Sequence, residues 1–246
     1  MAARRRLRPA ARISFQVRAL VSALLLLAGC AAPRSSLSVE AREAIGIEAR
    51  SSGPRWMAVS CVRAHLDAAP ATTFLFGGPL DEQRPTWPGK SEGIIPAGTP
   101  VTLLDVVFPS ERSLLDRPGG TPREQVWVKL QLPGGTVAIL PLPNTARSEQ
   151  DFWGGLGQWV TRFDPGLQTA SWNDAVVEAV RTRHLVVEMP DDAVTAAWGP
   201  PLRKDVRFDS GLRRESWIWP GSGRSAELLD GKLLEARAPD ATGTVP

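Results

Sequence analysis

Short apolar segments separated by tight, glycine-containing turns limit most strongly what this chain can fold into. Val126–Leu132 alternates between apolar and other side chains, and Gly134-Gly135 separates it from a second apolar segment at Val137–Leu142. Asp230-Gly231 stands between two further segments near the C-terminus. Because Gly-Gly and Asp-Gly favour the turns of antiparallel hairpins, the sequence predicts antiparallel β structure in two separate regions and excludes an all-helical fold.

The region between residues 55 and 145 has a β pattern throughout. Trp56–Val62 is a first strand candidate, and Val101–Phe108 is rich in the β-branched residues that favour strands. Between Arg63 and Gly93 the chain carries a Pro- and Gly-rich stretch, which we interpret as a long inserted loop.

Helices are predicted after residue 145. Ser148 with Asp151 resembles a capping box, and apolar residues then recur at helical spacing, so we expect a connecting helix within 146–170 that packs between domains. Ser171 is placed to cap a second helix. A third starts at Pro190, has acidic residues in its first turn and ends at Gly199. Strands are predicted from the segments 202–208, 212–219, 224–229 and 232–236.

The N-terminus has the composition of a secretory leader. The first 29 residues hold six Arg and no acidic residue, and an apolar run at Ala19–Ala28 follows the charged start. Without them the chain has 23 basic and 26 acidic residues, so it offers no basic stripe for nucleic acid. No stretch reaches the ~20 apolar residues of a membrane-spanning helix.

The end of this leader, Leu27-Ala28-Gly29-Cys30, resembles the lipobox of bacterial lipoproteins. The resemblance implies cleavage between Gly29 and Cys30, thioether lipidation of Cys30 and acylation of its new amino group. Several acyl chains would hold a membrane far more firmly than one, and Ala31 favours the outer membrane. A plain secretory signal followed by an unrelated Cys is the alternative.

Two further resemblances concern the body of the chain. The short strands, the Ile94–Pro100 entry and the hairpin resemble a bacterial SH3-like barrel. The run from Met189 to Pro201, with Glu215–Trp219 and Asp230–Leu233, resembles the SmpA/OmlA family, which are outer-membrane lipoproteins that accompany the β-barrel assembly machinery. This implies an α+β fold, with an SH3-like β-barrel module followed by two helices and a three-stranded antiparallel meander.

These features predict six consecutive regions. Residues 30–54 are interpreted as a solvated tether, although a short helix over Val39–Arg50 with Ser38 as N-cap is an alternative. The predicted regions are a signal peptide (1–29), a tether (30–54), an SH3-like β module (55–145), a connecting helix (146–170), an SmpA/OmlA-like domain (171–238) and a disordered tail (239–246).

The sequence offers little for catalysis, so we expect neither an enzyme nor a cofactor. Cys61 lies in an apolar strand, where a buried inert thiol is the common outcome, and no nucleophile elbow is present. His65 and His184 are interpreted as surface or capping residues, and two His leave little for a metal site. Arg183, near a helix C-terminus, suits the helix dipole, and we assign it nothing more.

Tryptophan supplies the only ligand candidates. Trp87 stands in the Pro-rich stretch and Trp127 on the polar face of its strand, where either could contact a peptide or glycan, although packing of Trp127 on the inserted loop is as good an explanation. We therefore expect a lipid-anchored protein at the periplasmic face of the outer membrane, with a non-catalytic binding or scaffolding role in envelope assembly or integrity. The alternative is binding of peptidoglycan stem peptides through the SH3-like module.

Overall fold

The computed structural model describes residues 35–77, 89–165, 169–219 and 223–238. These residues form five helices and two sheets, so the predicted α+β class is confirmed. None of the helices in these ranges is long and apolar enough to cross a membrane.

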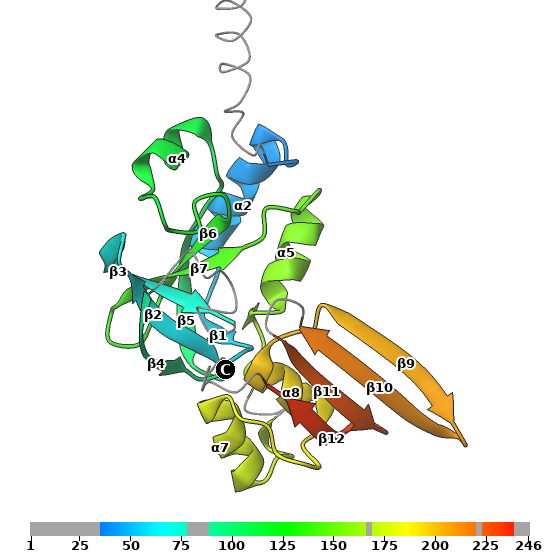
Figure 1. Ribbon diagram of the computed structural model, residues 1–246. Coiled ribbons are helices and arrows are strands. Elements are labelled where there is room, and N and C mark those ends of the chain that lie inside the picture. The colour runs from blue at the N-terminus through cyan, green and yellow to red at the C-terminus, as the bar shows by residue number, and fades with distance from the viewer. Residues whose placement is uncertain (1–34, 78–88, 166–168, 220–222, 239–246) are drawn as a thin grey trace, which may run out of the picture.

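One mixed sheet contains eight strands in the order β4-β2-β3-β7-β6-β5-β1-β8. A parallel pairing between β3 and β7 makes it mixed, and its other neighbours are antiparallel. Figure 1 shows this sheet beside the two helices α2 (Val39–Ser51) and α5 (Glu149–Gly157). Its strands are β1 (Arg55–Met57), β2 (Cys61–Leu66), β3 (Ala69–Phe76), β4 (Gly89–Ile95), β5 (Pro100–Val107), β6 (Val126–Gln131), β7 (Val137–Leu142) and β8 (Val160–Thr161).

The β6–β7 hairpin is confirmed where the sequence predicts it. Gly134 and Gly135 have φ values of 82° and 86°, a region that side chains with a Cβ rarely adopt. The predicted strand Trp56–Val62 is divided into β1 and β2. The stretch between Arg63 and Gly93 is not one long loop, because it contains β3 and most of β4; a short helix, α4 (Glu111–Asp116), lies between β5 and β6.

The structure differs from the predicted solvated tether over α2, where the alternative of a short helix holds. The Ser38 side chain accepts a hydrogen bond from the Ala41 N–H and caps the helix. Ile45 and Ala49 are fully buried in the core of the large sheet, and α2 packs against β5. The stretch folds onto the sheet because these apolar side chains lie on one helix face and lose water there.

The connecting helix is shorter than predicted. Ser148 caps α5 by accepting a hydrogen bond from the Asp151 N–H, as its capping pattern indicates, but the helix ends at Gly157. Val160 then pairs with β1 in the sheet, and Phe163 is 83% exposed. Three glycines in α5 lower its helix propensity. The apolar residues that follow Gly157 therefore do not extend the helix, and Val160 pairs in the sheet instead.

The C-terminal part begins with α7 (Asp174–Thr182) and α8 (Asp191–Trp198). Asn173, not Ser171, caps α7 by accepting a hydrogen bond of 2.9 Å from the Val176 N–H. The predicted start of α8 at Pro190 and its end at Gly199, with φ of 85°, are confirmed.

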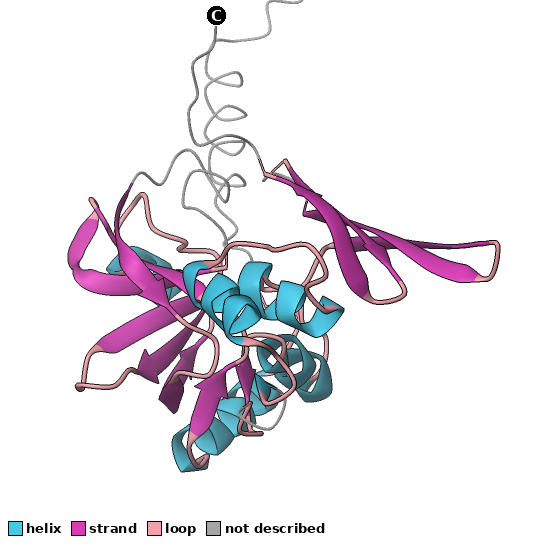
Figure 2. Ribbon diagram, turned by 90° about the horizontal axis from the view of Figure 1, so that it is seen from below, coloured by secondary structure: helices cyan, strands magenta, loops and turns pink. Residues whose placement is uncertain are grey.

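The second sheet has four strands, so the three-stranded meander was an undercount. They are β9 (Arg203–Asp209), β10 (Leu212–Trp219), β11 (Arg224–Leu229) and β12 (Lys232–Arg237), in antiparallel order β12-β11-β10-β9. All four predicted segments pair, because Ser210-Gly211 and Asp230-Gly231 each close a turn with positive φ. Figure 2 shows the strands β9 and β10 extending away from the rest of the molecule.

Candidate functional site

The predicted site residues fall into two groups. Gly29 and Cys30, the cleavage and lipidation positions, lie outside the described residues, and so does Trp87. Trp127 lies on β6 and is half-buried. Its Nε1 donates a hydrogen bond of 2.8 Å to the Pro122 carbonyl, and the Arg117 guanidinium lies 4.2 Å from its ring centroid.

The ring of Trp127 also packs edge-on against Phe74, with 5.6 Å between the ring centroids. Phe74 belongs to β3, which lies in the stretch that the sequence analysis interpreted as an inserted loop. Arg117 itself is buried and donates hydrogen bonds to the carbonyls of Val107, Arg123 and Gln125. Burial lowers the pKa of Arg117 to about 10, and nearby Arg123 adds to the shift. One face of the indole is therefore used for packing, which favours a structural role for Trp127.

The candidate catalytic residues have structural contacts. Cys61 is fully buried, and burial raises the pKa of its thiol to about 12 against a small opposing effect of Arg183. The two ring nitrogens of His65 lie 2.9 Å from the Thr72 carbonyl and 3.2 Å from Glu92 Oε2. Among the described residues, no cluster of His, Cys, Asp and Glu could hold a metal ion.

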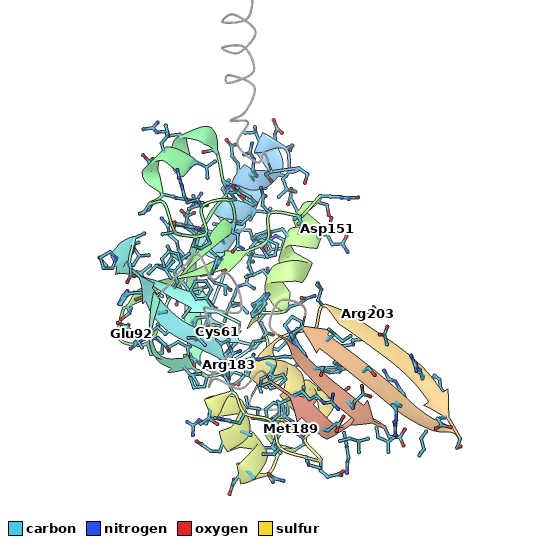
Figure 3. The ribbon with its side chains drawn as sticks, in the orientation of Figure 1. Cys61, Glu92, Asp151, Arg183, Met189 and Arg203 are labelled. Atoms are coloured by element: carbon cyan, nitrogen blue, oxygen red, sulfur yellow. The ribbon has the colours of Figure 1, made fainter. Side chains whose placement is uncertain are left out.

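Arg183 joins the two parts of the protein, a role that the sequence analysis missed. It ends α7 in the left-handed conformation and is 8% exposed. Its guanidinium donates hydrogen bonds to the carbonyls of Ser60, just before β2, and of Phe76 and Gly77, at the end of β3. Figure 3 shows Arg183 next to Cys61, between the large sheet and the C-terminal part. No local sequence signal distinguishes this arginine from an exposed one at a helix end.

Ser60 completes this junction from the other side. Its hydroxyl donates a hydrogen bond of 2.6 Å to the Val180 carbonyl and accepts one of 2.9 Å from the Ala97 N–H. Its own N–H donates to the Ala196 carbonyl of α8 at 2.8 Å. The two helices are thus fixed to the large sheet by buried hydrogen bonds.

The β9–β10 hairpin also carries exposed apolar residues. Paired residues on neighbouring strands share a face, so Val206 and Phe208 lie on the same side as Glu215 and Arg213, their partners, and as the core residue Trp217. Val206 is 46% exposed and Phe208 76%, whereas Trp217 is 1% exposed. Two apolar side chains, Val206 and Phe208, therefore remain exposed on this face, beside the charged partners Glu215 and Arg213.

This hairpin has a net positive charge, whereas the chain beyond the leader has more acidic than basic residues. Its only buried acid, Glu215, accepts a hydrogen bond from Trp217 Nε1 at 3.0 Å and lies 3.0 Å from Arg213. Arg203 pairs with Asp205 at 2.9 Å, and Figure 3 shows Arg203 at the start of β9. The two strands carry five basic residues, Arg203, Lys204, Arg207, Arg213 and Arg214, against the three acidic residues Asp205, Asp209 and Glu215. The hairpin thus combines an exposed apolar face with a net positive charge.

Comparisons with known proteins add no relative. A scan of protein-family models, a search of curated proteins and a search of solved structures each returned no match.

Proposed function

We propose that this chain is a lipid-anchored protein of the cell envelope with a non-catalytic binding or scaffolding role. The observation that carries the proposal is the β9–β10 hairpin, whose apolar side chains Val206 and Phe208 are exposed to solvent. Exposed apolar side chains beside charged ones, as Val206 and Phe208 are beside Glu215 and Arg213, can mark a protein interaction site. The partner that fits this face is an envelope protein segment with acidic residues beside apolar ones, because the hairpin is net basic.

The leader gives the location. Its charged start, apolar run and terminal Cys30 support export, lipidation and retention at the periplasmic face of the outer membrane. The protein would then present its hairpin to partners at that membrane, in a role in outer-membrane assembly or integrity.

We also infer the finer architecture from the two resemblances. The antiparallel run β5-β6-β7 with β1 at its side supports an SH3-like module within 55–145. Two helices followed by an antiparallel sheet support an SmpA/OmlA-like domain within 171–238, here with four strands.

Site-specific photo-crosslinking in cells tests the hairpin. A photo-reactive amino acid at position 208 is expected to give a defined adduct, and the same residue at position 115 is expected to give none. Leu115 is a matched control because it is 83% exposed on α4, far from the hairpin in sequence. The adduct from position 208 should weaken when Arg213→Gln removes the positive charge that is paired with Phe208 on the same face. Equal adducts from both positions, or a yield that ignores the charge, would refute the proposal.

Fractionation tests the anchor separately. The wild-type protein is expected in the membrane fraction, with an acylated Cys30 at its mature N-terminus by mass spectrometry. Cys30→Ala is expected to release it or leave its leader uncleaved. An unacylated wild-type protein in the soluble fraction would contradict the anchor but leave the crosslinking result intact.

A further inference from the structure

Two side chains that line a cleft beside the large sheet each have a buried hydrogen-bond donor without an acceptor in the described part of the chain. The cleft has a volume of about 670 Å³ and lies among α2, β1, α5 and β8. Arg55 lines it and is only 4% exposed, yet its Nη2 has no hydrogen-bond partner among the described residues. The Nε1 of Trp153, also in the lining, is buried and lacks a partner among them too. Buried donors without acceptors are uncommon in native proteins, and each one calls for an explanation.

The charges around this cleft do not balance. Arg55, Arg162 and Glu48 are the charged side chains in its lining, so the cleft has a net positive charge. Glu48 forms an ion pair with Arg162. Within the described ranges, the Arg55 guanidinium donates one hydrogen bond, of 3.4 Å, from its Nε to the Ser52 hydroxyl. Burial lowers the pKa of Arg55, the positive charge of Arg162 lowers it further, and the negative charge of Glu48 opposes both effects. An additional negative charge in the cleft would offset both effects.

The same aromatic ring lies close to both guanidinium groups. Arg55 is 5.5 Å and Arg162 6.0 Å from the ring centroid of Trp153. Leu156, Val160 and the exposed Phe163 supply further apolar lining. The occupant therefore needs an anionic group next to an apolar body.

The position of β8 beside the cleft indicates what kind of molecule the cleft binds. This strand is the last of the large sheet, and in the described part of the chain it pairs only with β1. Residues 160–163 all line the cleft. An edge strand beside a pocket can bind an extended peptide through its backbone, while the pocket captures the peptide's terminal carboxylate.

We propose that this cleft binds the C-terminal carboxylate of an extended peptide with an apolar last residue. The carboxylate accepts hydrogen bonds from Arg55 Nη2 and Trp153 Nε1, and the last side chain packs on the ring of Trp153 and on Phe163. This site is distinct from the β9–β10 hairpin, so either can fail without the other.

Isothermal titration calorimetry on the purified full-length protein tests the site. The probes are acetyl-Ala-Ala-Val with a free carboxylate and the same peptide as its C-terminal amide. The acid is expected to bind at least about tenfold more tightly, since tenfold corresponds to the loss of one modest charged interaction. Arg55→Met and Trp153→Phe should each weaken binding of the acid by a similar factor. Arg50→Gln is the control, because Arg50 is an exposed arginine of α2 that pairs with Asp105 and does not line the cleft.

Urea unfolding distinguishes a binding residue from a structural one. Arg55→Met should leave the unfolding midpoint unchanged or raise it, because it removes a buried cation with an unpaired donor. Where Arg55→Met fails to fold, Trp153→Phe and the exposed Arg162→Gln provide the same binding test. Equal affinity for the acid and the amide, undetectable binding of the acid, or full affinity in Arg55→Met would each overturn the proposal.

Discussion

Arg183 donates a buried hydrogen bond to Ser60 across the junction between the large sheet and α7. The Arg183 guanidinium donates to the Ser60 carbonyl, and the Ser60 hydroxyl donates to the carbonyl of Val180, three residues before Arg183. Both residues are buried, at 8% and 0% exposure. Because these bonds are shielded from water, they contribute more than surface contacts of the same kind.

Replacing Arg183 should therefore loosen the junction. Arg183→Met leaves the carbonyls of Ser60, Phe76 and Gly77 without their donor. We expect a loss of about 2–4 kcal/mol in the free energy of unfolding, measured in urea, since each buried unsatisfied acceptor is costly. Arg181→Met is the control, because Arg181 is exposed on the same helix, and should change stability by less than about 0.5 kcal/mol. Equal effects of the two substitutions would contradict the role given to Arg183.

The contacts of Arg117 lead to a second prediction about stability. Its planar guanidinium donates to three backbone carbonyls and lies over the ring of Trp127. Lysine keeps the charge but can neither reach three fixed acceptors nor stack in the same way. Arg117→Lys is expected to lower the free energy of unfolding by about 1–3 kcal/mol.

The control for this change is Arg112→Lys, on the exposed part of α4. It should leave the urea midpoint within experimental error. An unchanged midpoint in Arg117→Lys would show that the packing on Trp127 adds nothing to stability, and would return Trp127 to the list of ligand contacts.

Local signals in the sequence were sufficient for most elements of the fold. Alternation and glycine turns predicted the β6–β7 hairpin, and Pro190 with Gly199 delimited α8. These features succeed because turns and caps depend on the backbone preferences of neighbouring residues. The fate of α2 depended instead on a distant surface: its apolar residues are few, and only the sheet formed by later strands makes their burial favourable.

The candidate sites were harder to predict for the same reason. Arg55 and Trp153 are separated by about a hundred residues and come together only through the pairing of β1 with β8. Arg183 looks like any basic residue at a helix end until the fold buries it. The exposed face of β9 could not be recognised either, because alternation predicts two faces but not whether a helix covers one of them.

Cys61 gives a prediction about pH. Burial raises its pKa from 9.0 to about 12, so at pH 8 the native protein holds roughly a thousandfold less thiolate than an unperturbed cysteine. Iodoacetamide should fail to label Cys61 in the native state and should label it in urea. The test uses Cys30→Ala, because the chain has only two cysteines.

The same shift has a consequence for stability. Above pH 9 the unfolded state releases the thiol proton while the folded state retains it. The contribution of Cys61 is therefore fully present below pH 9 and is lost as the pH rises through about 12. Cys61→Ala should fall less steeply in stability over this window than its parent. Parallel curves for the two proteins would contradict the raised pKa.

Two glycines give opposite predictions for the same substitution. Gly199 has φ of 85°, and a Cβ there would lie 3.3 Å from the Trp159 ring and 3.6 Å from Val59. Gly199→Ala is expected to lower the free energy of unfolding by about 1–3 kcal/mol, because it adds backbone strain and forces the indole to move. Gly155 lies on the exposed side of α5 with nothing near its Cβ position.

Gly155→Ala should raise the stability by about 0.5–1 kcal/mol, since alanine has the higher helix propensity. Thermal unfolding of both variants and their parent in one buffer measures the difference. A matched loss in both would mean that α5 is not helical at Gly155, and a neutral Gly199→Ala would mean that Trp159 does not pack against the end of α8. The opposite signs arise because the first substitution acts on a tertiary contact and the second only on the local backbone.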